Sequence, residues 1–155
     1  MSPTVKKLPS PTSYPENISI LLVSPNPADL PALRAILHHA HWDLRQVDTA
    51  EQAARHIQRN APSLLICERD LPDGTWKDVL WCISASAVSS SLLVASRRAD
   101  EALWEEVLNL GGYDVLLKPF DKSEVVRVVG MAWRHWWNRS LHRAAGRAAA
   151  MQRTA

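Results

Sequence analysis

Cysteines and long apolar runs are scarce in this chain. Its 155 residues include only Cys67 and Cys82, which form no metal-binding or redox motif. No apolar run approaches the roughly 20 residues that cross a bilayer, so we expect no membrane span. Lys6 and Lys7 are followed by no apolar stretch, so we also expect no signal peptide. A reducing, cytoplasmic location is the default expectation for such a chain.

Acidic residues are absent from the last fifth of the sequence. All 16 Asp and Glu residues lie within residues 1–124, whereas residues 125–155 contain six arginines. The split predicts an acidic body with a basic tail. Arg139, Arg143 and Arg147 are four residues apart and would form one stripe on a helix. Such a stripe suits nucleic acid, anionic lipid or an acidic protein, or is simply solvated; no DNA-binding module fits beside it, which weakens the nucleic-acid alternative.

Strand and helix patterns alternate five times along the chain. Apolar, partly β-branched runs predict strands at residues 18–23, 42–47, 64–67, 92–95 and 115–117. Each is followed by a segment with helical spacing. This alternation predicts an α/β fold, a doubly wound five-stranded parallel sheet with helices on both faces. The proline-containing residues 1–17 are expected to form a flexible arm.

Capping residues and apolar spacing locate two of the predicted helices. The first helix is expected to start near Asn26 or Asp29, because either side chain can cap it. Apolar residues at helical spacing, Leu103, Trp104, Val107 and Leu108, mark the fourth helix.

The last helix contains no proline after Asp121, and we expect its end to project or fray. Its apolar face includes Val125, Val129, Trp133 and Trp136, with Trp137 beside it. We expect Trp133, Trp136 and Trp137 to contribute to a partner contact, most simply a homodimer.

Four polar residues lie at the carboxyl ends of predicted strands. Ser24 follows the first strand, Glu68 the third, Ser96 the fourth and Lys118 the fifth. In doubly wound sheets these ends meet at one edge, where ligands bind. The sequence therefore predicts a polar site formed by these four residues.

Three segments containing these residues resemble the active-site corners of response-regulator receiver domains. They are Val-Ser-Pro-Asn-Pro at 23–27, Cys-Glu-Arg-Asp-Leu-Pro-Asp-Gly at 67–74 and Leu-Lys-Pro-Phe at 117–120. Family members carry two acids after the first strand, an aspartate four residues before Pro-Asp-Gly, a Ser or Thr after the fourth strand, and Lys-Pro after the fifth. The resemblance implies a flavodoxin-like three-layer domain over residues 18–138, followed by a basic helical extension at 139–155.

The chain departs from that pattern where the chemistry would occur. Ser24-Pro25 replaces the acid pair that would help to bind magnesium, and Glu68 replaces the phosphorylated aspartate. Glutamate is longer than aspartate by about 1.5 Å, so Glu68 is expected to reach Lys118 and Ser96. The resemblance also implies that the Lys118-Pro119 bond is cis. Val115 occupies the position of the family's aromatic switch residue.

We therefore expect an atypical receiver that acts in two-component phosphorelay signalling by phosphorylation-independent protein–protein interaction. It would use no metal or cofactor and would not be an enzyme. Its partner would be a sensor kinase or a downstream signalling protein, and the leading surface is the face of the fourth helix, fifth strand and fifth helix. Glu68 either holds one signalling state or merely satisfies Lys118. Two alternatives are a receiver phosphorylated at Glu68 or Asp70, and nucleic-acid binding through the basic tail.

Overall fold

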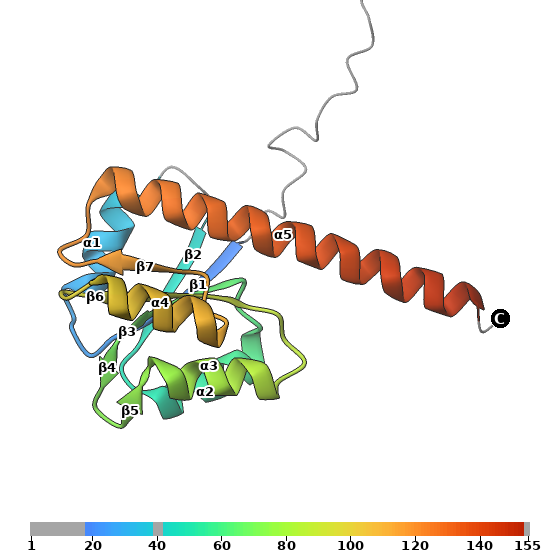
Figure 1. The fold of residues 1–155 in the computed structure, drawn as a ribbon, viewed down its shortest axis with the longest axis horizontal. Helices are drawn as coiled ribbons and strands as arrows, with labels where there is room; N and C mark the ends of the chain where they lie inside the picture. The colour runs from blue at the N-terminus through green and yellow to red at the C-terminus, as the bar shows by residue number, and fades with distance from the viewer. Residues whose placement is uncertain (1–17, 39–41, 154–155) are drawn as a thin grey trace, which may run out of the picture.

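Five parallel strands form the central sheet of the molecule (Figure 1). The structure is a computed structural model that describes residues 18–38 and 42–153, so the arm expected at 1–17 lies outside the described residues. The strand order is β2-β1-β3-β6-β7. The strands are β1 (Ile18–Val23), β2 (Trp42–Val47), β3 (Leu64–Glu68), β6 (Ser91–Ser96) and β7 (Asp114–Leu117). The predicted doubly wound parallel sheet is confirmed.

Helices cover both faces of this sheet. They are α1 (Asp29–Ile36), α2 (Ala50–Asn60), α3 (Trp76–Ala85), α4 (Glu101–Leu110) and α5 (Lys122–Arg153). One core joins the sheet to α1 and α5, and a second core joins the opposite face to α2, α3 and α4. The central strand β3 contributes to both cores because its side chains alternate between the faces.

Register places the carboxyl ends of the strands at one edge. Val23 of β1 pairs with Cys67 of β3, and Glu68 pairs with Ala95 of β6. The same edge continues into β7, where Ser96 pairs with Leu117. Residues that follow these strands are therefore brought together although they are far apart in the sequence.

One feature differs from the sequence predictions, and a second was left open by them. A short antiparallel pair, β4 (Asp70–Leu71) with β5 (Gly74–Thr75), forms around the Pro-Asp-Gly turn and was not predicted. In α4, Leu103 and Val107 are buried, whereas Trp104 is 47% exposed and Leu108 is 37% exposed. The second core therefore contacts only the narrow stripe made by Leu103 and Val107.

Helix α5 extends beyond the domain. Its first half packs into the core through Val125, Val129 and Trp133, but every residue from Leu141 to Met151 is exposed. Figure 1 shows this end projecting past the rest of the described chain, as the sequence predicted. Among residues 18–38 and 42–153, no helix combines the length and the hydropathy that a bilayer crossing requires.

Candidate functional site

Lys118 is the centre of a buried ionic cluster at the carboxyl edge of the sheet. Its ammonium Nζ donates hydrogen bonds to Asp29 Oδ2 and to Glu68 Oε2, each at 2.6 Å. The Lys118 and Asp29 side chains are each 7% exposed, and the Glu68 side chain is 21% exposed. The predicted Glu68–Lys118 contact is confirmed, as is the cis bond between Lys118 and Pro119.

Asp29 is the member of this cluster that sequence reasoning missed. It was considered only as a helix cap, but the residue at the N-cap of α1 is Ala28, and the carboxylate of Asp29 turns into the site instead. The first turn of a helix favours a negative charge, so this position suits an acid. One signal was available: Asp29 is the only Asp or Glu between Ser24 and Trp42.

The loop after β1 holds Asp29 in place. Ser24 is buried, and its hydroxyl donates to Asp29 Oδ2 at 2.6 Å while accepting a hydrogen bond from the Asn26 N–H at 3.1 Å. Gln46 of β2 donates from Nε2 to the carbonyl oxygens of Ser24 and Asn26, both at 2.9 Å. Asp29 Oδ2 therefore accepts from both a hydroxyl and an ammonium. We call Ser24, Asp29, Glu68 and Lys118 the Lys118 cluster.

The electrostatics of the cluster favour a charged lysine. Burial alone would lower the pKa of Lys118, but its hydrogen bonds and Coulomb attraction to Asp29 and Glu68 outweigh burial, and the net result is a raised pKa. The ammonium therefore remains protonated at neutral pH. It occupies the space between two carboxylates from different elements, α1 and β3.

The other predicted site residues lie near the cluster without bonding to it. Ser96 is buried, but its hydroxyl accepts from the Arg98 N–H at 3.1 Å rather than bonding to Glu68 as expected. Pro25 is exposed. Val115 is half-buried and packs against the second core.

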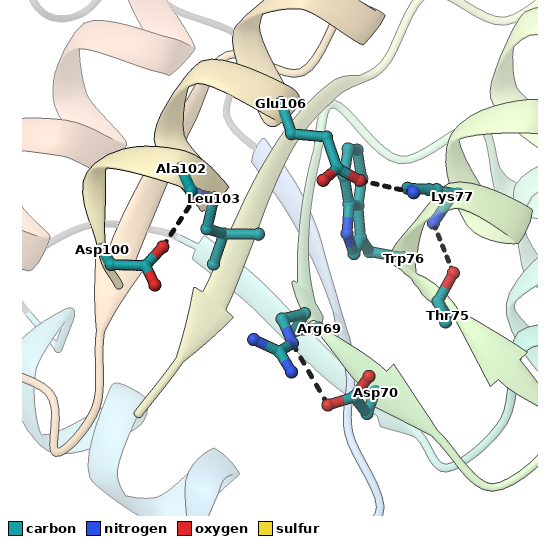
Figure 2. A pocket seen from close by; sticks show the side chains of 9 residues that line it. All are labelled: Arg69, Asp70, Thr75, Trp76, Lys77, Asp100, Ala102, Leu103 and Glu106. Carbon is teal, nitrogen blue, oxygen red and sulfur yellow. Dashed lines mark hydrogen bonds and ion pairs between the residues drawn. The ribbon is translucent and has the colours of Figure 1, made fainter. Parts of the chain in front are cut away.

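Asp70 lies beside its sequence neighbour Arg69 and not in the Lys118 cluster's hydrogen-bond set; Figure 2 shows the Arg69–Asp70 pair. Its exposed carboxylate accepts from Arg69 Nε at 3.2 Å, beside a hollow of about 280 Å³ between α3 and α4. An ion pair between Lys77 and Glu106 at 2.5 Å joins the two helices across this hollow. Asp70 is therefore a surface carboxylate with a local partner.

Asp73, of the neighbouring turn, has a structural role. Its two carboxylate oxygens accept from the N–H groups of Ala50 at 2.8 Å and Glu51 at 3.0 Å. These backbone hydrogen bonds lower the pKa of Asp73, because they favour the ionised form. The turn thereby caps the N-terminus of α2, beside the cap made by Thr49.

The three tryptophans expected at a partner contact face the domain. Trp133 is buried in the first core, so it is a core residue rather than a contact residue. Trp136 and Trp137 are partly buried against the same core, and Trp137 stacks on Trp133 with ring centroids 6.0 Å apart. A partner contact through the remaining surface of Trp136 and Trp137 stays a prediction.

The fold and the site define a doubly wound α/β domain with a buried lysine at the carboxyl edge of its sheet. Residues 20–130 match the response regulator receiver domain family, and the chain belongs to that family. A curated relative, the transcriptional regulatory protein TrcR of Mycobacterium tuberculosis, is 27% identical over 111 residues. The match covers 70% of this chain but only 42% of TrcR, so the chain corresponds to less than half of that protein's length.

Solved receiver domains share the fold. The signal receiver domain of an HD domain-containing protein from Pseudomonas fluorescens superposes with a TM-score of 0.74 at 23% identity, covering 83% of this chain and 95% of that one. The receiver domain of a sensor histidine kinase from Pseudomonas aeruginosa gives a TM-score of 0.65 at 24% identity, covering 77% and 97%. That crystal structure has a magnesium ion coordinated in its active-site cleft.

Proposed function

We propose that this receiver domain signals through protein–protein contacts that do not depend on phosphorylation. The observation that carries the proposal is the position of the Lys118 ammonium, bonded at 2.6 Å to both Asp29 and Glu68. The two carboxylates that face the site thus already share a cation that belongs to the protein. The domain is a binding module rather than an enzyme.

The donor set does not fit the family's magnesium ion. Magnesium requires oxygen ligands in near-octahedral geometry, but Asp29 Oδ2 already accepts from both Ser24 and Lys118. Pro25, at the position of a second acid, has no side-chain oxygen to offer. Within residues 18–38 and 42–153, no three His, Cys, Asp or Glu side chains gather into a group that could hold a metal. A metal between the carboxylates would displace the buried ammonium from its partners, which is costly.

The charge of the Lys118 cluster also disfavours phosphoryl transfer. The transferred group carries negative charge that a bound metal normally offsets, whereas two carboxylates and one ammonium give this cluster a formal excess of negative charge. Glu68 has one more methylene group than an acceptor aspartate, and its carboxylate is already engaged by Lys118 at 2.6 Å. Asp70 is bonded to Arg69 and lacks the lysine partner.

The face made by α4, β7 and α5 supports a partner contact that does not require phosphorylation. Val115 replaces the aromatic residue that would move in response to phosphorylation, so the switch has no reporter. The face of α4, β7 and α5 nevertheless exposes two large apolar side chains, Trp104 and Leu117, which line one hollow. Exposed apolar groups gathered on one face are typical of an interaction surface. A sensor kinase, a downstream signalling protein or a second copy of the chain would bind there.

Amide NMR spectra test whether the domain switches. We expect the resonances of α4 and β7 to remain in place when magnesium and acetyl phosphate are added together. A receiver domain that has the acid pair and the acceptor aspartate serves as the positive control under the same conditions. A concerted shift of α4 and β7 resonances that reverses as acetyl phosphate is consumed would contradict the proposal.

A further inference from the structure

We propose that the exposed end of α5 docks on α4 of a second copy of this chain. The inference rests on the proposed function, because it names a partner for the same α4–β7–α5 face. We define the basic extension as residues 141–153 of α5 and the acidic face as Asp100, Glu101, Trp104, Glu105 and Leu108 of α4 and its cap. The basic extension carries arginines and no acid, whereas the acidic face carries carboxylates and no basic residue.

The acidic face combines unpaired carboxylates with exposed apolar groups. Glu101 and Glu105 are one helical turn apart and exposed, and neither forms an ion pair within the described part of the chain. Trp104 and Leu108 lie beside them, also one turn apart. Helix α4 contains no Lys, Arg or His that would balance its charge.

A hollow next to these residues enlarges the acidic face. It has a volume of about 370 Å³ and is lined by Glu101, Trp104, Val115, Leu117 and Glu124, among others. The lining of this hollow combines apolar side chains, including the 44% exposed Leu117, with the carboxylates of Glu101 and Glu124. Such a surface suits a basic helix with small apolar side chains.

The basic extension has the complementary pattern. Arg143 and Arg147 are one turn apart, exposed, and without ion pairs among the described residues. Ala144 and Ala148 directly follow them in sequence. Their small side chains would allow the backbone of the extension to approach Trp104 closely. The extension contains three arginines and no acid. Its charge therefore opposes that of α4 at the same spacing, which favours pairing across an interface.

The extension is directed away from the acidic face of its own chain, because Arg143 borders a separate hollow lined by Val88 and by Gly111 at the C-cap of α4. Helix α5 is continuous from Lys122 to Arg153, and its first half is fixed in the core through Val129 and Trp133. Figure 1 shows the extension leading away from the domain that contains α4. At 1.5 Å per residue the extension is about 20 Å long, more than the 10 residues of α4 require. A second copy of the chain supplies an acidic face on α4 with the charge and length that the basic extension requires.

Two charge-reversed variants of the full chain test the docking in trans. One carries Glu101→Lys and Glu105→Lys, and the other carries Arg143→Glu and Arg147→Glu. Sedimentation velocity at tens of micromolar should show association of the parent chain and loss of association for each variant alone, because like charges then meet. Mixing the two variants in equal amounts should restore association, since each supplies the surface that the other has lost.

Matched controls separate docking from unfolding and from general charge effects. Asp43→Lys with Glu51→Lys reverses two exposed acids elsewhere on the body and should associate like the parent. All substituted positions are exposed, so thermal unfolding followed by circular dichroism should show little change. Raising salt from about 0.05 M to about 0.5 M should weaken association of the parent by shortening the screening length.

Three results would overturn the inference. They are a monomeric parent chain, unchanged association of the Glu101/Glu105 variant, and a mixture that stays monomeric although the parent associates. The last result would indicate a symmetric contact that does not pair these two surfaces. A monomeric parent that also takes up no phosphate would contradict this inference alone, whereas a phosphorylated chain that obeys the charge reversal would contradict the proposed function alone.

Discussion

At the scale of single residues, the two acids of the Lys118 cluster differ in burial. The Asp29 side chain is 7% exposed, whereas the Glu68 side chain is 21% exposed. Water can partly replace a lost partner at Glu68 but hardly at Asp29. Asp29 also bonds to Ser24, so its removal leaves both a buried hydroxyl and a buried ammonium with fewer partners.

We therefore predict that Asp29→Ala destabilises the fold more than Glu68→Ala. Removing one member of a buried ion pair costs about 3 kcal/mol or more, and we expect Asp29→Ala to approach this value. Glu68→Ala should cost roughly half as much, and Glu68→Gln less again because it keeps an acceptor. Urea unfolding measures all three, with Glu51→Ala as the control for an exposed pair that is worth about 0–1 kcal/mol. An Asp29→Ala chain as stable as the parent would rule out the Lys118 cluster described above.

The raised pKa of Lys118 predicts a dependence of stability on alkaline pH. A group whose pKa is higher in the folded state binds its proton more tightly there, so its contribution is complete below the ordinary value of 10.5 and is lost as the pH rises through the folded value. The urea midpoint of the parent should therefore decline above pH 10.5. The control variant Asp29→Asn with Glu68→Gln removes the partners that raise the pKa. Its alkaline decline should be smaller, and an equal or steeper decline in this control would contradict the assignment.

The sequence predicted part of this cluster for a clear physical reason. Glu68 and Lys118 each follow a strand whose register is fixed by the hydrophobic pattern, so their proximity followed from topology. Asp29 lies in a helix whose start could not be located from the sequence, and a shift of one residue changes the direction of its side chain. The same uncertainty concealed the distinct roles of Asn26 and Ala28 at the start of α1.

At the scale of secondary-structure elements, the buried stripe of α4 and the length of α5 set what is exposed. The sequence predicted the strands closely, because continuous apolar runs mark central strands of a parallel sheet. It could not predict that Trp104 and Leu108 are exposed, since helical spacing alone does not show how wide a stripe the neighbouring core can cover. Tertiary packing decides that width, and here it leaves an apolar strip on the surface.

We predict that the basic extension contributes little to the stability of the domain. Truncation after Ser140 removes only exposed residues of α5, so the free energy of unfolding should change by no more than about 0.5 kcal/mol. Trp133→Ala provides the contrast within the same helix. Trp133 is buried in the first core, and its truncation should cost about 3–5 kcal/mol. Urea unfolding of both chains checks the prediction, and a truncated chain that unfolds as readily as Trp133→Ala would show that the extension is part of the fold.

At the scale of the whole molecule, the domain has a largely buried ionic cluster in one place and an exposed interaction surface in another. The Lys118 cluster satisfies its own charges at the carboxyl edge of the sheet, whereas the α4–β7–α5 face and the end of α5 leave complementary charges and apolar groups exposed. In this account, signalling depends on the amount of chain and partner present rather than on a phosphoryl group. The acidic body and basic tail are then two halves of one binding system.

The most direct test of this account is the intact mass of the chain after incubation with magnesium and acetyl phosphate. We expect no added mass, under conditions in which a receiver domain with the acid pair and acceptor aspartate gains one phosphoryl group. An Asp70→Asn chain and a Glu68→Gln chain, treated identically, locate any adduct that forms. A stoichiometric gain of one base-labile phosphoryl group by the parent chain, lost in either variant, would contradict the central claim.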